Sequence, residues 1–241
     1  MQRYFAIDKK DKYFKLEEKD YHHIKTVMRM KENDVIEVVF NKTLYLAHIE
    51  NIKEDIIIIE DKLVEIEKDN SKKVNIIIPY LKEQKLDFIF QKATELGVDK
   101  ITLVPFSRSV VKLKEKSTKY TRWNRILKEA SEQSKRLVTP NLSLLESFKE
   151  IKNLDGLNLI CSTAEKNQTI KKVMKTSTNY DTINIVIGPE GGLTEQEENT
   201  LVEYGYKKVT FGNRILRVET VPLYILSIIN YEFMEWFTWT F

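Results

Sequence analysis

Two short loops of this chain carry residues that could do chemistry. The first is GPEGG at 188–192, and the second is GNRILRVET at 212–220. Each follows an apolar run that is typical of a strand, and ligands of parallel α/β sheets bind beyond the carboxyl ends of the strands. Arg214, Arg217 and Glu219 lie close together in the second loop. Such residues could move a proton or stabilise a charged transition state, or they could form an internal ion pair.

The glycine-rich loop matches neither of the common phosphate-binding motifs. It lacks the lysine and hydroxyl residue of a Walker A loop and the spacing of G-x-G-x-x-G. Its glycines let backbone groups approach a ligand closely, and the charge of Glu190 favours a neutral or cationic ligand. S-adenosylmethionine has this character, because it carries a sulfonium and no phosphate. The alternative is a tight turn with an exposed glutamate, before a helix that Thr194 and Glu197 cap.

The first 70 or so residues are predicted to form a small β-barrel. The candidate strands are rich in β-branched and aromatic residues, and short polar turns separate them. They lie at 4–7, 34–40, 43–50 and 55–60, with one helix at 17–30. The polar stretch EKDNSKK at 67–73 is the predicted boundary.

From residue 73 to residue 241 the pattern changes to strands that alternate with helices. The predicted strands are 74–80, 100–106, 157–163, 182–188 and 207–212. The predicted helices are 83–97, 121–137, 166–175, 194–205 and 219–237. This alternation indicates an α/β domain with a mostly parallel sheet that helices cover on both faces.

Charge and composition narrow the class of protein. The net charge of +3 does not by itself indicate nucleic-acid binding, but residues 81–140 hold 14 Lys and Arg against 7 Asp and Glu. This stretch could attract a polyanion or form a solvated face. The single cysteine, Cys161, lies in an apolar run and is predicted to be a buried thiol in a reducing cytosol. The apolar end, 221–241, contains Asn230 and two glutamates, so we expect a buried or dimer-interface helix and no membrane span.

Five blocks of the sequence, in order, resemble the 16S (small-subunit) ribosomal RNA uracil-N3 methyltransferases (RsmE-type) of the SPOUT superfamily. The resemblance covers nearly the whole chain, and its more specific motifs are the last two blocks. The blocks are HHIKTVMRMKENDVIEVV, KATELGVDKITLVPFSRSV, EASEQSKRLVTP, IGPEGGLTEQE and GNRILRVET. The family usually has R-T-E-T-A where this chain has Arg217, Val218, Glu219, Thr220 and Val221.

The resemblance implies a fold and a reaction. The fold would be a PUA-like β-barrel at 1–70 that positions RNA, followed at 73–241 by a SPOUT α/β domain with a C-terminal deep trefoil knot. The reaction would be methyl transfer from S-adenosylmethionine to N3 of one uridine of 16S ribosomal RNA, in this family uracil-1498. The protein would be a cytoplasmic homodimer whose partner is 16S rRNA, within the small ribosomal subunit. No Cys/His cluster is present, and no metal is expected.

The resemblance also implies roles for single residues. Arg217 would stabilise negative charge on the uracil oxygens, and Glu219 would accept the N3 proton or orient Arg217. The residues expected to bind the cofactor are Thr163, Gly188, Pro189, Glu190, Gly191, Gly192, Gly212, Ile215 and Leu216. The residues expected to contact RNA are Arg3, His23, Arg29, Arg108, Arg125 and Arg136.

Two alternatives stay open on the sequence. The first is another SPOUT methyltransferase, which would act on tRNA or on a ribose 2′-hydroxyl. The second is an RNA-binding relative that has lost catalysis, and the loss of a threonine hydroxyl at Val218 is compatible with it. The position of the methylated atom distinguishes the first, and cofactor binding distinguishes the second.

Overall fold

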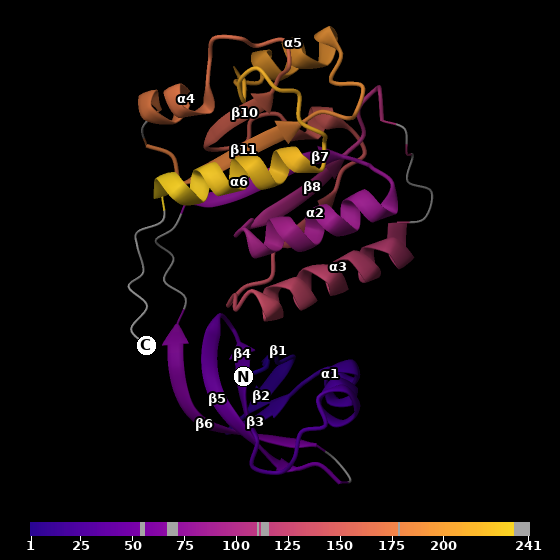
Figure 1. Cartoon of the computed structure of the whole chain (residues 1–241), viewed down its shortest axis with the longest axis vertical. Helices are drawn as coiled ribbons and strands as arrows, with labels where there is room; N and C mark the ends of the chain where they lie inside the picture. Colours follow the sequence, from indigo (N-terminus) through magenta and orange to yellow (C-terminus); the bar gives the residue numbers. More distant parts are fainter. Residues whose placement is uncertain (54–55, 67–71, 110, 112–115, 178, 234–241) are drawn as a thin grey trace. The chain divides into compact units, whose positions relative to one another are not determined.

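The structure is a computed structural model and describes residues 1–53, 56–66, 72–109, 111, 116–177 and 179–233 (Figure 1). The chain divides into two compact units. The N-terminal unit is Met1–Asp69 with Lys128–Thr139, and the C-terminal unit is Asn70–Leu127 with Pro140–Phe241. Helix α3 (Lys116–Gln133) therefore begins in the C-terminal unit and ends in the N-terminal unit. The predicted domain limits, 1–70 and 73–241, place this second segment, residues 128–139, in the C-terminal domain instead.

The N-terminal unit is built on a curled six-stranded sheet in the order β1-β4-β5-β6-β3-β2. Its strands are β1 (Arg3–Phe5), β2 (Asp8–Lys10), β3 (Tyr13–Lys15), β4 (Val35–Phe40), β5 (Thr43–Asn51) and β6 (Ile57–Ile66). The pairs are antiparallel except β1 with β4, and the sheet is consistent with a PUA-like domain. The sequence does not predict β2 and β3, which are short and mostly exposed.

The helix predicted at 17–30 is present in a shorter form. Helix α1 (Glu18–His22) continues directly into a π-helical turn at His23–Val27. The fully buried side chain of Ile24 packs against strand residues such as Ile36 and Ile49, and this cluster is the core of the unit.

The C-terminal unit contains a six-stranded sheet in the order β12-β10-β11-β7-β8-β9. Its strands are β7 (Lys73–Pro79), β8 (Lys100–Val104), β9 (Asn141–Leu144), β10 (Leu157–Cys161), β11 (Thr182–Ile187) and β12 (Lys207–Val209). All of these pairs are parallel, so the prediction of a mostly parallel sheet is confirmed. The sequence does not predict the short edge strand β9.

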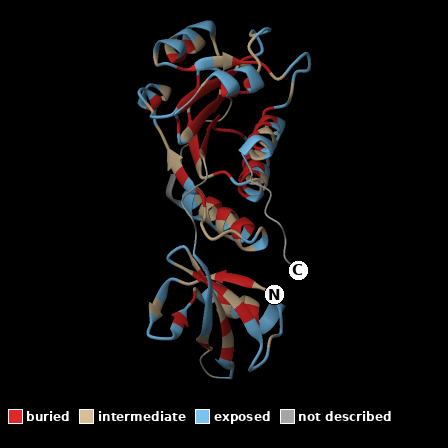
Figure 2. Ribbon diagram, turned by 90° about the vertical axis from the view of Figure 1, so that its left-hand side faces the viewer, coloured by how far each residue is buried: buried red, intermediate tan, exposed pale blue. Residues whose placement is uncertain are grey.

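Helices cover both faces of this sheet, as the alternating pattern predicts (Figure 2). They are α2 (Glu83–Glu95), α4 (Ile170–Thr176), α5 (Glu195–Glu203), α6 (Thr220–Phe233) and the 3₁₀ turn η2 (Phe148–Ile151), which was not predicted. Because side chains alternate along a strand, Ile76 and Ile78 pack towards α2 and α6 while Ile77 packs towards α5 and η2.

Several predicted helices have different limits in the structure: α4 begins at Ile170 instead of residue 166, α2 ends at Glu95 instead of residue 97, and α3 and α6 also differ. Helix α3 begins before the predicted residue 121 and ends before residue 137, and the backbone of Lys135 is left-handed with φ 61°. Helix α6 begins at Thr220, and the predicted end at residue 237 lies outside the described residues. Within the described ranges, no helix has the length and apolar character that a membrane crossing requires.

A ladder of buried amide side chains crosses the parallel sheet away from the loops at 188–192 and 212–220. Asn184 Nδ2 donates to Asn158 Oδ1 at 2.8 Å, and Asn75 Nδ2 donates to Asn184 Oδ1 at 2.9 Å. Thr102 Oγ1 then donates to Asn75 Oδ1 at 3.1 Å. These bonds link β10, β11, β7 and β8 through side chains and favour one register, because a slip would leave buried polar groups unpaired.

Candidate active site

A pocket of about 660 Å³ lies at the carboxyl ends of β10, β11 and β12. Because these three strands are neighbours in the sheet, the loops that follow them meet at one edge. The pocket has the size of small-molecule sites, roughly 300–1,000 Å³. All the residues predicted to bind the cofactor line it: Thr163, Gly188, Pro189, Glu190, Gly191, Gly192, Gly212, Ile215 and Leu216. The structure therefore brings them together, while their role as cofactor ligands stays a prediction.

The glycine-rich loop joins β11 to α5, and its geometry favours glycine at two positions. Gly192 has φ 71°, in the left-handed region. A Cβ atom at Gly188 would lie 3.1 Å from the backbone N of Leu193. Helix α5 then begins with the predicted capping box, which is confirmed: Thr194 Oγ1 accepts from the Glu197 N–H at 3.1 Å, and Glu197 Oε2 accepts from the Thr194 N–H at 2.8 Å.

The negative charge of Glu190 has a partner within the protein. Lys85 Nζ, on the first turn of α2, lies 2.6 Å from Glu190 Oε1 and 3.0 Å from Glu219 Oε2. This lysine compensates part of the negative charge of Glu190, so Glu190 alone does not select a cationic ligand. Burial alone would raise the pKa of Glu219, but its own backbone N–H and Lys85 hold that pKa below its usual range.

In the loop before α6, Arg217 and Glu219 have different environments. Arg217 is exposed and lines the pocket, and its carbonyl accepts from the Thr220 N–H at 2.8 Å at the start of α6. Glu219 is paired with Lys85. Val218 and Val221, the two departures from the family pattern, are buried in the core of the unit. Both departures are therefore accommodated by apolar packing beneath the pocket.

The turn after β10 forms a third wall of the pocket. Ser162 Oγ donates to Glu198 Oε1 at 2.8 Å, and Lys208 Nζ lies 2.7 Å from Glu198 Oε2. Cys161 is half-buried and lines the pocket, so the predicted full burial is not found. Its surroundings raise the pKa of the thiol by desolvation, which disfavours the reactive thiolate.

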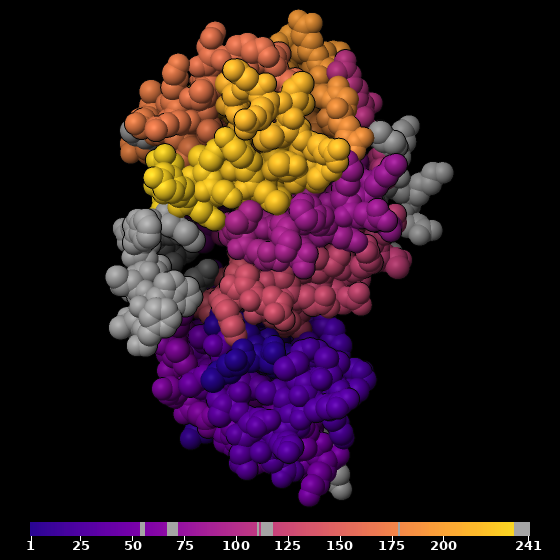
Figure 3. Space-filling view, in the orientation of Figure 1, coloured from indigo at the N-terminus to yellow at the C-terminus, as the bar shows by residue number. Residues whose placement is uncertain are grey.

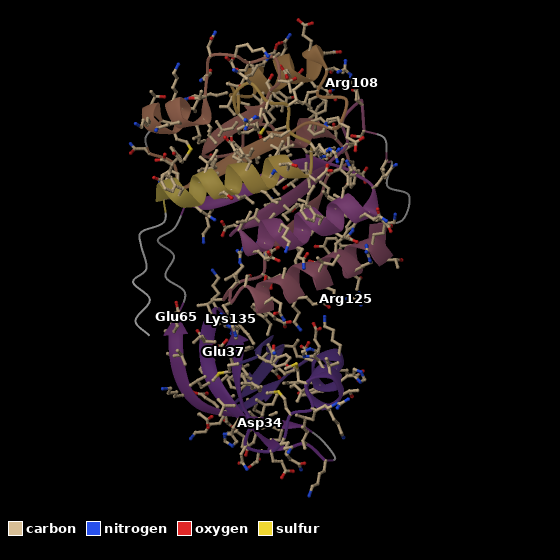
Figure 4. All side chains as sticks on the ribbon, viewed as in Figure 1. Asp34, Glu37, Glu65, Arg108, Arg125 and Lys135 are labelled. Atoms are coloured by element: carbon tan, nitrogen blue, oxygen red, sulfur yellow. The ribbon has the colours of Figure 1, made fainter. Side chains whose placement is uncertain are left out.

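Arg108 follows β8 and supports the glycine-rich loop. Its Nη1 donates to the carbonyl oxygen of Gly191 at 2.7 Å, and the pocket reaches its side chain. In the same loop, the Ser107 N–H donates to Glu197 Oε1 at 2.7 Å. Figure 4 labels Arg108 at this end of the C-terminal unit. The sequence predicts an RNA contact for Arg108, whereas the structure places it against a loop of the pocket.

Residues 68–230, which include every residue that lines the pocket, match the RNA methyltransferase domain family. The chain belongs to this RNA methyltransferase family. Residues 16–62 match a second family, the RNA methyltransferase PUA domain, and this agrees with the curled sheet of the N-terminal unit.

Several members of the RNA methyltransferase family resemble this chain over most of their length. A protein of Bacillus subtilis named ribosomal RNA small subunit methyltransferase E is 35% identical over 252 residues, covering 96% of this chain and 97% of the relative. A Borreliella burgdorferi relative, ribosomal RNA small subunit methyltransferase E 2, is 30% identical, covering 87% of each. The crystal structure of a ribosomal RNA small subunit methyltransferase E from Neisseria gonorrhoeae bound to S-adenosyl methionine is similar, with a TM-score of 0.83 and 26% identity over 96% of this chain and 98% of that one.

Arg3 does not have the placement of a phosphate ligand in this RNA methyltransferase. Its side chain is only 6% exposed, and its Nε lies 2.8 Å from Glu37 Oε2. The guanidinium also donates to the carbonyl groups of Lys135 and Arg136. Glu37 and Lys135, labelled in Figure 4, form a further ion pair. This placement indicates that Arg3 stabilises the N-terminal unit.

The other residues predicted to contact RNA are more accessible. His23 is half-buried, and its Nδ1 lies 2.9 Å from the Tyr4 hydroxyl. Arg29 and Arg125 are exposed, and Arg136 is half-buried with its Nε donating to the Val138 carbonyl at 3.1 Å. Their contacts with RNA stay predictions.

Sequence reasoning missed Lys85, Ser162 and Glu198. Lys85 lies 105 residues before Glu190 and falls between the first two family-like blocks of the sequence, so no local pattern connects the two. In the part of the chain that the structure describes, no group of three or more His, Cys, Asp or Glu residues is placed to hold a metal ion.

Proposed function

We propose that this protein transfers a methyl group to N3 of one uridine, uracil-1498, in 16S ribosomal RNA. The observation that carries the proposal is the pocket at the ends of β10, β11 and β12, where the predicted cofactor residues and Arg217 meet. The relatives named ribosomal RNA small subunit methyltransferase E support ribosomal RNA as the substrate class.

The residues of the pocket fit S-adenosylmethionine, which the similar Neisseria structure contains. Glycine backbone lines one wall, and the apolar side chains of Ile187, Ile215 and Leu216 line others. This mixture suits a ligand with an apolar base and thioether chain. When bound, S-adenosylmethionine supplies the electrophilic methyl group.

Arg217 is proposed to act on the uracil ring, and Glu219 is proposed to orient Arg217. N3 carries a proton and is a poor nucleophile until that proton leaves. Arg217, which is exposed at the pocket, would stabilise the negative charge that spreads to the uracil oxygens. Glu219 has a lowered pKa and is therefore a weak proton acceptor, so we assign it to orienting the cations Lys85 and Arg217.

The target uridine must be unpaired or extruded, because N3 lies on the Watson–Crick edge. A second surface is then needed to hold the surrounding RNA. The PUA family match and the exposed Arg29 support the N-terminal unit in this role, with His23, Arg125 and Arg136 as further candidates.

The proposal includes a deep trefoil knot in the C-terminal unit and a cytoplasmic homodimer that acts on the small ribosomal subunit. Helix α6 supports the dimer: it buries Val221, Ile225 and Ile229 in its own unit and exposes Tyr224 and Tyr231. Figure 3 shows α6, in yellow, at the surface of this unit. Sedimentation of the purified protein at several concentrations tests the dimer.

Methylation in vitro tests the reaction. The purified protein is incubated with labelled S-adenosylmethionine and small ribosomal subunits from cells that lack its gene, and the RNA is digested and analysed by mass spectrometry. We expect 3-methyluridine at one site. A methylated ribose, or methylation of tRNA in a parallel reaction, would replace the proposal with another SPOUT activity. Failure to bind S-adenosylmethionine would indicate a non-catalytic relative.

A further inference from the structure

Lys85 connects the two loops on which the proposed function rests. Its ammonium lies 2.6 Å from Glu190 Oε1, in the glycine-rich loop, and 3.0 Å from Glu219 Oε2, in the loop before α6. The side chain of Lys85 is 30% exposed, that of Glu190 is 53% exposed and that of Glu219 is 20% exposed. The contact with Glu219 is thus the more shielded of the two.

The lysine comes from an element that is fixed independently of either loop. Helix α2 is anchored in the core by Leu86, Ile89 and Phe90, and Leu86 directly follows Lys85. A side chain on a well-packed helix can hold residues of two separate loops at a place that neither loop sets by itself. Lys85 also lines the pocket itself.

Electrostatics makes the arrangement depend on the charge of Lys85. Both carboxylates approach one ammonium, so without it two negative charges would face each other at short range and repel. The hydrogen bonds to Glu190 and Glu219 raise the pKa of Lys85, which keeps the ammonium charged. The charged groups around Glu219 are Lys85 and Arg217, and those around Lys85 are the two glutamates.

We propose that Lys85 is a positioning residue, which holds the glycine-rich loop and the Arg217–Glu219 loop in the arrangement that binds S-adenosylmethionine. The inference rests on the proposed function and extends it, because it assigns a role to a residue outside the family-like motifs. Lys85 acts here through Glu190 and Glu219.

Calorimetric titration with S-adenosylmethionine tests this role without any RNA. Lys85→Met removes the charge with little change in length, and Lys85→Arg keeps the charge. Lys92→Met is the matched control, because Lys92 lies on the same helix and pairs with Glu95 at 2.8 Å, outside the pocket. We expect Lys85→Met to weaken binding about five- to tenfold, since exposed ion pairs are each worth up to about 1 kcal/mol. Lys85→Arg and Lys92→Met should stay within about twofold of the wild type.

A double-mutant cycle and a pH series separate positioning from a general effect on folding. With Glu190→Gln and Glu219→Gln already present, Lys85→Met should change the affinity less than twofold, because no carboxylates remain to repel. In the single variant the two carboxylates face each other without the cation, and protonation removes their repulsion, so the loss of affinity relative to the wild type should become smaller as the pH falls. A general effect on folding would give the same loss of affinity in the glutamine background and at every pH.

The outcomes distinguish the two proposals. Wild-type affinity in Lys85→Met, or an equal loss in Lys85→Arg, would overturn the role of Lys85 and leave the proposed function intact. A loss of the same size in the glutamine background would also overturn it. Absence of binding by the wild-type protein would overturn the proposed function together with this inference.

Discussion

Arg108 Nη1 lies 2.7 Å from the carbonyl oxygen of Gly191, so a side chain from the loop after β8 holds the glycine-rich loop at the wall of the pocket. The Arg108 side chain also passes close to the loop backbone, because a Cβ atom at Gly191 would lie 3.4 Å from Arg108 Cδ. The loop thus has a support in Arg108 and another in Lys85, which contacts Glu190.

We therefore expect Arg108→Ala to weaken S-adenosylmethionine binding more than RNA binding. A hydrogen bond from a charged donor is worth roughly 1.5–3 kcal/mol, and partial exposure reduces this, so we expect about a five- to tenfold loss of affinity. Calorimetry measures the cofactor, and filter binding measures a 16S rRNA fragment. Arg125→Ala removes an exposed arginine away from the pocket that is itself a candidate RNA contact, so it is the control for the cofactor measurement and should leave S-adenosylmethionine binding unchanged. Unchanged cofactor binding together with weakened RNA binding would restore the RNA role that the sequence predicts.

Arg217→Ala should slow methyl transfer with little effect on the cofactor. Loss of a donor that stabilises developing negative charge costs roughly 10²–10³-fold in rate. Arg217→Lys keeps the charge without the planar fork and should recover part of the loss. Single-turnover methylation at saturating cofactor measures the step. Arg214→Ala, in the same loop, should cost much less; an equal loss would mean that the loop needs positive charge in general and not Arg217 at its place.

Asn184→Ala should destabilise the C-terminal unit, because Asn184 is the centre of the buried amide ladder. The change removes the partners of Asn75 Nδ2 and Asn158 Oδ1. Each buried group left unsatisfied costs about 1–3 kcal/mol, so we expect roughly 2–5 kcal/mol in the free energy of unfolding by urea. Asn141→Ala removes an exposed asparagine from edge strand β9 and should change it by less than about 0.5 kcal/mol. Equal effects of the two variants would contradict a stabilising ladder.

The elements that carry most of the fold could be predicted because their hydrophobic periods are strong. Strands such as β7 and β11 are mostly apolar, and α2 repeats Leu86, Ile89, Phe90 and Ala93 at helical spacing. The strands β2 and β3 are short and largely exposed, and β9 is a short edge strand, so their pairing depends on neighbouring strands and leaves little trace in composition. The knot was expected from the family resemblance alone.

Some residues of the candidate site could also be predicted from the sequence, and others could not. Glycines at 188 and 192 and the capping box at Thr194 are local features, so a single sequence indicates them. Lys85 and Arg108 lie about a hundred positions before the glycine-rich loop in the sequence, and only the tertiary structure brings them into contact with it. Long-range contacts also decide that Lys128–Thr139 belongs to the N-terminal unit.

Glu132 is the clearest source of pH-dependent stability, because it is a carboxylate in a buried cluster of the N-terminal unit. Lys128 Nζ lies 2.5 Å from Asp20 Oδ2 and 3.3 Å from Glu17 Oε2, but 3.6 Å from Glu132 Oε1, beyond hydrogen-bond distance. Burial raises the pKa of Glu132 to about 7, and the nearby charge of Asp20 adds to the rise, although Lys128 opposes it.

The sign of the effect follows from the raised pKa. Between pH 4.5, the ordinary pKa of the glutamate, and pH 7, the folded protein keeps a proton that the unfolded chain has lost. Glu132 therefore lowers the free energy of unfolding as the pH rises through this window, and its effect is constant above it. Glu132→Gln keeps the shape without the charge. We expect it to match the wild type near pH 4.5 and to exceed it by roughly 1–3 kcal/mol at pH 8.

Urea unfolding of both proteins from pH 4.5 to pH 8 measures this difference directly, since the contributions of all other groups cancel to first order in the comparison. Glu32→Gln removes an exposed glutamate from a turn of the same unit and should give a difference that does not change with pH. A Glu132→Gln variant that is less stable than the wild type at pH 8 would mean that the attraction to Lys128 outweighs the cost of burial. The carboxylate would then stabilise the attachment of the 128–139 segment, and the wild type should lose that advantage over the variant as the pH falls.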